Sequence, residues 1–106
     1  MELTEDQSYY AVIFTSIQAE NTSGYAEMAS KMETLAQEQP GYLGMEHARS
    51  ELGITISYWK NEAAIAGWKN QVDHLVAQKT GKAKWYLKYS VRVCKVEREY
   101  HFNTEN

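Results

Sequence analysis

Cysteine and proline are almost missing from this chain, which has one of each among its 106 residues. Because a disulfide needs two cysteines, the single Cys94 excludes an intrachain disulfide. The three histidines, His47, His74 and His101, are widely spaced, and with one cysteine they do not form a zinc-binding pattern. We therefore predict no metal site.

Clusters of basic residues and long apolar segments are also lacking. The 11 lysines and arginines occur singly, and the formal net charge is −3 with a pI near 5.6. This distribution argues against nucleic acid or an anionic membrane as a partner. No apolar stretch approaches the roughly 20 residues of a membrane helix. The acidic segment 1–6 is unlike the basic start of a signal peptide, so we expect a cytoplasmic protein.

Phenylalanine is rare, whereas tyrosine and tryptophan are abundant. The chain has two Phe residues against eight Tyr and three Trp. Tyr and Trp combine a large apolar ring with one polar group, which suits ligand pockets and interfaces. Aromatic residues also serve ordinary packing in β-rich domains. The length favours one domain spanning residues 1–106, with a core at about 9–98 and flexible ends.

The hydrophobic pattern predicts four strands and two helices. Apolar residues recur at helical spacing in two segments and alternate, or run together with β-branched residues, in four others. Pro40-Gly41 ends the first helix, and Asn61 is a good N-cap for the second. The expected order is strand, helix, strand, strand, helix, strand, at residues 8–18, 23–38, 42–50, 54–60, 62–80 and 85–98.

This β-α-β-β-α-β order predicts a ferredoxin-like α+β fold, with a four-stranded antiparallel sheet and both helices on one face. The first, second and fourth strands are apolar or aromatic on both faces. A bare apolar sheet face is unfavourable in water. We therefore predict a homodimer in which two sheets pack face to face as a dimeric α/β barrel.

One stretch of the sequence resembles a known family. Pro40-Gly41-Tyr42-Leu43-Gly44, followed by residues 54–65 and then Trp68, is similar to the antibiotic biosynthesis monooxygenase (ABM) family. The resemblance covers roughly residues 9–98. It implies a dimeric α+β barrel with an apolar pocket between the helices and the sheet of each subunit.

The resemblance also implies an activity. It predicts a monooxygenase that needs no cofactor and oxidises a small phenol- or quinol-like aromatic ligand with O2. In that chemistry the substrate loses a proton, its anion passes an electron to O2, and the radical pair recombines. The protein supplies a dry cavity, orientation and a group that handles the proton.

Two residues of the second helix are the predicted catalytic residues. Trp68 lies on the apolar stripe and is suited to stack against a planar ligand, although core packing is the commoner role of such a tryptophan. His74 follows six residues later, and its side chain titrates in the range needed for proton transfer. A surface histidine without a function is the alternative.

Five further residues are predicted to bind the substrate. They are aromatic, cationic or titratable residues placed on or beside the sheet, namely Trp59, His47, Arg49, Tyr86 and Arg92. His47 and Arg49 share an apolar strand face with Leu43 and Met45, which is costly for polar groups unless they are paired or functional. Packing, a dimer salt bridge or ordinary sheet contacts are the alternatives.

The sequence departs from the haem-degrading relatives of the family. Those proteins use a histidine ten residues after the tryptophan that matches Trp68, and here that position is Gln78. They also use an asparagine in the first strand, where this chain has Ile13-Phe14. Without the histidine the axial iron ligand is missing, so haem binding or degradation is the least favoured activity. A non-catalytic ligand-binding or stress-response barrel is the main alternative.

Overall fold

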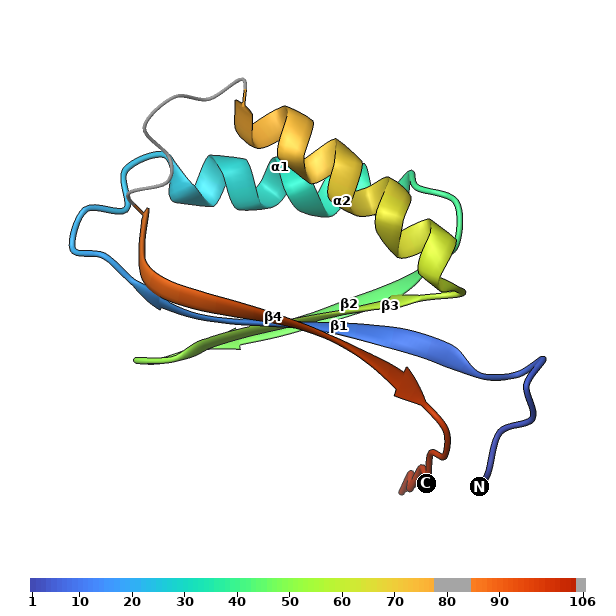
Figure 1. Cartoon of the computed structure of the whole chain (residues 1–106). Helices are drawn as coiled ribbons and strands as arrows, with labels where there is room; N and C mark the ends of the chain where they lie inside the picture. The colour runs from blue at the N-terminus through green and yellow to red at the C-terminus, as the bar shows by residue number, and fades with distance from the viewer. Residues whose placement is uncertain (78–84, 105–106) are drawn as a thin grey trace.

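The computed structural model describes residues 1–77 and 85–104, and the side chains of 74–77 lie outside that description. The predicted order of elements is confirmed (Figure 1). The elements are β1 (Tyr9–Gln18), α1 (Tyr25–Gln37), β2 (Tyr42–Arg49), β3 (Gly53–Trp59), α2 (Glu62–Ala77) and β4 (Tyr86–Val96).

The strands form one antiparallel sheet in the order β2-β3-β1-β4. Both helices lie over the same face of this sheet, and within residues 1–77 and 85–104 no helix covers the other face (Figure 1). The ferredoxin-like prediction is therefore confirmed. Within the described residues, no helix is both long and apolar enough to cross a membrane.

The two helices begin differently. At α2 the side-chain oxygen of Asn61 accepts a hydrogen bond from the backbone N–H of Ala64 at 2.8 Å, as expected for an asparagine cap. At α1 the capping position is Gly24, in the left-handed region with φ 85°, and no side chain caps the helix. The Asn21 side chain instead accepts a bond from the N–H of Ser23.

A register shift in β2 changes which residues share a face. The shift lies between Tyr42 and Gly44, so Tyr42 pairs with Trp59 while Met45 pairs with Ser57. Tyr42 therefore lies on the helix-facing side, where its ring contacts that of Trp59 at 5.5 Å between centroids. The expectation that Leu43 shares a face with Met45 is wrong, because Leu43 falls in the shift and is 55% exposed.

The helices leave much apolar surface uncovered. Among the described residues, only four apolar side chains are buried, those of Ala11, Met28, Ala36 and Trp59. Three apolar residues of β4 lie on the helix-facing side but remain 49–60% exposed, namely Tyr89, Val91 and Val93.

The other sheet face is apolar mainly along its two central strands. Ile13 of β1 is opposite Ile56 of β3, and Ile54 is 38% exposed there. The expectation of an apolar fourth strand on this face is wrong, since Arg92 and Cys94 of β4 are on this side. One chain therefore exposes apolar groups on both faces of its sheet.

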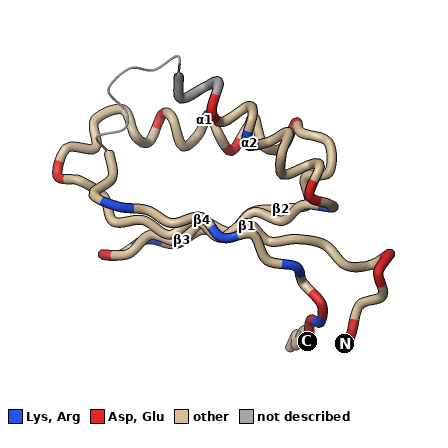
Figure 2. The backbone as a smooth tube through the Cα atoms, in the orientation of Figure 1, with Lys and Arg blue, Asp and Glu red and all other residues tan. Residues whose placement is uncertain are grey.

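The chain termini lie side by side beyond the sheet (Figure 1). Leu3 N–H donates to the carbonyl of Glu97, and Glu99 N–H donates to that of Met1, both at 2.8 Å. Charged residues are dispersed along the described chain, without a block of one sign (Figure 2).

Gly41 and Gly67 provide a matched test of the connection between the helices and the sheet. Gly41 has φ 84°, and a Cβ there would lie 2.6 Å from the Cβ of Ala64. We expect Gly41→Ala to lower the free energy of unfolding by about 2–4 kcal/mol, from backbone strain plus overpacking.

Gly67 lies in the interior of α2, and a Cβ there meets nothing within 4 Å. We expect Gly67→Ala to raise the free energy of unfolding by about 0.5–1 kcal/mol. Urea denaturation of both variants measures the two effects. Equal effects of the two substitutions would contradict the close approach of Gly41 to α2.

Candidate functional site

A tryptophan pair lies at one end of the helix-facing side of the sheet. Trp59 is fully buried at the end of β3, and its Nε1 donates to the buried hydroxyl of Ser57 at 2.8 Å. Trp68 of α2 stacks on it, with ring centroids 5.7 Å apart and planes 24° apart. Trp59 has no surface that a ligand can reach in this conformation, so it supports half-buried Trp68. We call these two residues and Tyr42 the Trp end.

An arginine crosses the sheet at the opposite end. Arg49, the last residue of β2, pairs with Gly53 of β3, and its Nη2 donates to Ser16 Oγ of β1 at 2.6 Å. Ser16 is 1% exposed. The guanidinium carbon also lies 6.0 Å from the centre of the Tyr25 ring of α1. We call Ser16, Tyr25, Arg49, Gly53 and Tyr86 the Arg end.

Aromatic rings surround the Arg end. Tyr86 contacts Tyr25, Phe14 and Tyr89, with ring centroids 5.4–5.8 Å apart. Trp85 also contacts the Tyr25 ring edge to face, with centroids 5.6 Å apart, and its Nε1 donates to the carbonyl of Ser23. The rings come from α1, from β1, and from β4 with the residue that precedes it, three segments that are distant in sequence.

Tyr86 keeps its proton well above neutral pH. Burial raises the pKa of its phenol, a hydrogen bond with Tyr25 raises it further, and the charge of Arg49 opposes the rise. A phenol in this state is a hydrogen-bond donor and not a base at neutral pH. The Arg end therefore presents hydrogen-bond donors, together with a cation.

A less crowded strip separates the two ends. Tyr10, which pairs with Trp59, and Phe14, which contacts Tyr86 of the Arg end, are four residues apart on β1, which is roughly 13 Å at ~3.3 Å per residue. Val12 lies on the helix-facing side between them, with its partners Ser57 of β3 and Val93 of β4. Ser57 is buried, Val12 is half-buried and Val93 is 49% exposed, so the helix layer leaves this strip open to solvent on its β4 side.

The structure brings some predicted site residues together and separates others. Trp59 and Trp68 form one group, and Arg49 and Tyr86 belong to the second. His47 lies on the helix-facing side of edge strand β2, opposite Thr55 and exposed.

Two predicted residues lie apart from these groups. Arg92 pairs with Ile13 on the sheet face away from the helices, so the structure does not bring it to either end. His74 belongs to α2, but its side chain lies outside the described residues, and Gln78 lies outside them entirely.

Most of the Arg end was not predicted from the sequence. Ser16 and Tyr25, like the neighbouring Phe14, resemble ordinary strand or helix residues, and no local pattern distinguishes them. Gly53 was interpreted as part of a hairpin link, but it is the first residue of β3 and its φ is not positive. The sequence signal that could have indicated this site is Arg49 placed opposite Gly53 across the link between the second and third strands.

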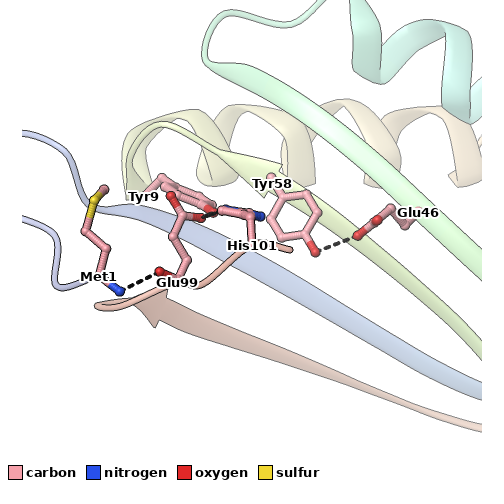
Figure 3. Close-up of polar contacts among 6 residues, drawn as sticks. All are labelled: Met1, Tyr9, Glu46, Tyr58, Glu99 and His101. Carbon is pink, nitrogen blue, oxygen red and sulfur yellow. Dashed lines mark hydrogen bonds and ion pairs between the residues drawn. The ribbon is translucent and has the colours of Figure 1, made fainter. Parts of the chain in front are cut away.

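A separate set of polar contacts lies on the opposite sheet face (Figure 3). The hydroxyl of Tyr9 donates to Glu99, and that of Tyr58 donates to Glu46 at 2.7 Å. His101 lies 3.5 Å from the same Glu99 carboxylate. No group of three potential metal ligands is found among the described residues.

Comparison with known proteins identifies the family. The model of the antibiotic biosynthesis monooxygenase family matches residues 8–80. The chain belongs to this family. It is 46% identical over 101 residues to the uncharacterized protein YqjZ of Bacillus subtilis, covering 93% of this chain and 89% of that one.

Solved structures share the fold of this ABM chain at low identity. SnoaB, a cofactor-independent oxygenase from Streptomyces nogalater, aligns with a TM-score of 0.62 and 11% identity, over 92% of this chain and 98% of that one. A variant of MhuD was solved with two manganese protoporphyrin IX molecules per active site. It aligns with a TM-score of 0.64 and 17% identity, over 88% of this chain and 99% of that one. At these identities the likeness establishes the fold alone.

The tyrosine environments predict an alkaline loss of stability. The hydrogen bond to Glu99, with lesser contributions from burial and charge, raises the pKa of Tyr9 from 10.0 to about 12, and the pKa of Tyr86 is raised mainly by burial. The unfolded chain therefore loses these protons first, so stability is complete below pH ~10 and falls as the pH rises towards 12 and above.

Urea midpoints measured across this alkaline range test the prediction. Tyr86→Phe removes one titrating group, so this variant should lose less stability than the wild type between the same pH values. Tyr100→Phe, at a tyrosine that is 79% exposed, is the matched control. Identical pH profiles for wild type and Tyr86→Phe would contradict the assigned environment.

Proposed function

We propose that this protein is a cofactor-independent monooxygenase that oxidises a small phenol- or quinol-like aromatic substrate with O2. The observation that carries the proposal is the open strip of the helix-facing sheet surface, bordered by Trp68 at one end and by the Arg end at the other. Its length suits a fused aromatic system. Membership of the ABM family and the fold shared with SnoaB support the reaction type.

The proposed reaction transfers one oxygen atom of O2 to the substrate. The phenol loses its proton, and the resulting anion gives one electron to O2 to form a substrate radical and superoxide. The radicals combine at a ring carbon, forming a C–O bond. Cleavage of the O–O bond, with loss of the hydrogen on that carbon, yields a quinone and one water molecule.

Six of the seven predicted residues have the following roles in this proposal, and Arg49 belongs to the Arg end that borders the strip. Trp68 stacks on the substrate ring with the face that Trp59 does not cover, and Tyr86 donates a hydrogen bond to a substrate oxygen. His74 on α2 accepts the phenolic proton, and His47 at the edge of the strip contacts the substrate from β2. Arg92, on the other sheet face, belongs to the subunit interface in this scheme.

The proposal includes a homodimer. Ile13, Ile54 and Ile56 form an apolar surface on the face that no helix covers. Pairing two such faces removes this surface from water and produces the expected dimeric barrel.

Sedimentation equilibrium should therefore give twice the chain mass of 12.2 kDa. Ile54→Glu places a charge on the proposed interface at a residue that is already 38% exposed, so we expect a folded monomer. Ser30→Glu, on the exposed side of α1, is the control and should remain dimeric. A monomeric wild type at high concentration would contradict the barrel.

Two other functions use the same fold. A non-catalytic binding protein would hold the aromatic ligand without turnover, and fold alone does not separate it from an oxygenase. Haem degradation is supported by the fold shared with MhuD. It is disfavoured because Gln78 replaces the expected histidine ligand in the sequence.

Oxygen uptake with a panel of naphthols and quinols tests the proposed activity. We expect uptake without added haem, flavin or metal, with one quinone formed per O2. Trp68→Ala should lower kcat/KM by about tenfold, since one aromatic stacking contact is lost. Lys69→Ala, the neighbouring position with a side chain 74% exposed, is the matched control and should retain full activity.

Binding without uptake would favour the non-catalytic alternative. Activity that appears only after haem is added would favour haem degradation. Circular dichroism of Trp68→Ala must match the wild type, because Trp68 also packs on buried Trp59.

A further inference from the structure

We infer that the Arg end is an anion-binding site, and that the ligand of this protein is an aromatic compound carrying an acidic oxygen group. This inference deepens the proposed function and rests on it for the aromatic class of the ligand. The acidic group is a carboxylate or a phenolate, which share the same recognition chemistry: planar oxygen anions that accept hydrogen bonds from a guanidinium.

The path of Arg49 across the sheet depends on a missing side chain. A Cβ placed on Gly53 would lie 2.1 Å from Nη2 of Arg49 and 2.2 Å from its guanidinium carbon. No side chain other than hydrogen is compatible with that position of the guanidinium. Gly53 thus provides the space in which the arginine reaches from edge strand β2 over β3 to β1.

The guanidinium is held by neutral groups. One N–H donates to the hydroxyl of buried Ser16, and the Tyr25 ring lies within cation–π range. Among the described residues, the ion pairs join Lys69 to Asp73, Lys95 to Glu5 and His101 to Glu99. Within that part of the chain, no carboxylate neutralises Arg49.

This arrangement leaves donors for a ligand. A guanidinium has five N–H groups, and Arg49 gives one hydrogen bond to a side chain in the described part of the chain. A cation fixed in place beside aromatic rings, with no protein anion beside it, favours a ligand that supplies both the anion and the ring.

The surrounding tyrosines strengthen the same preference. Tyr86 and Tyr25 are hydrogen-bonded to each other, so one hydroxyl proton of the pair remains for an anionic oxygen. Because burial raises the pKa of Tyr86, this phenol does not accept a proton from the ligand at neutral pH. Phe14 and Tyr89, stacked at 5.3 Å, provide an apolar wall beside it. An acidic group at Arg49 would place an attached ring against these side chains.

Titration calorimetry with three naphthalene probes tests the inference without requiring turnover. The probes are 1-naphthoate, which is anionic, naphthalene-1-methanol, which is neutral, and 1-naphthol, measured below and above its ionisation. We expect wild type to bind naphthoate at least about tenfold more tightly than the alcohol, the effect of one charge-assisted hydrogen-bonded contact. Tighter binding of naphthol on ionisation would identify phenolate as an accepted form of the anion.

Two variants remove the site by different means. Arg49→Gln deletes the charge, whereas Gly53→Ala keeps every charge and displaces the guanidinium. Both should bind naphthoate and the alcohol with equal affinity. Lys31→Gln removes one positive charge from an exposed position of α1 and should keep the wild-type preference. Arg49 is exposed, so Arg49→Gln should fold even if Gly53→Ala does not.

The outcomes separate this inference from the proposed function. Equal affinity of wild type for naphthoate and the alcohol would overturn the anion site and leave an aromatic site intact. A naphthoate preference that survives in Arg49→Gln would also overturn it, since another cation would then be responsible. Failure of the wild type to bind any probe would contradict the aromatic-ligand proposal as well.

Discussion

The buried indole of Trp59 determines how the helix layer meets the sheet. It is the largest fully buried side chain among the described residues, and its N–H is satisfied by Ser57 on the same strand. Because that hydrogen bond fixes the ring, α2 packs on it through Trp68 and β2 through Tyr42. Gly41, which precedes Tyr42, also lies close to Ala64 of α2 at this end of the sheet. Met28 and Ala36 of α1 are also buried, whereas Tyr89, Val91 and Val93 of β4 are not covered by the helices.

The opposite end of the same surface is organised by polar atoms. Arg49 crosses Gly53 to reach Ser16, and this link ties together three strands of the sheet while Tyr25 connects it to α1. Arg49 is exposed, and the serine and the ring engage only part of its guanidinium. An anionic ligand can make charge-assisted hydrogen bonds to the remaining N–H groups, which is the physical reason that such a ligand would be favoured there.

The exposed apolar groups connect the fold to assembly. A two-layer α+β unit normally buries one sheet face, and here even that face is incompletely covered along β4. Tyr89, Val91 and Val93 stay accessible although they lie on the helix-facing side. The other face carries isoleucines at its centre and Tyr–Glu pairs near its margin. Such an apolar centre with a polar rim is typical of surfaces that pack against another protein.

The sequence alone determined the order and type of the elements, because helical and strand periodicities, Pro40-Gly41 and the Asn61 cap are local signals. It also indicated the family, and it made Arg49 a candidate ligand-binding residue because its charge lies on an apolar strand face. Only the tertiary structure decided which residues meet. The shift in β2 brought Tyr42 beneath the helices, and strand pairing brought Ser16 and Gly53 under one guanidinium. Register across strands depends on contacts between distant segments, and such contacts leave no periodic trace in the sequence.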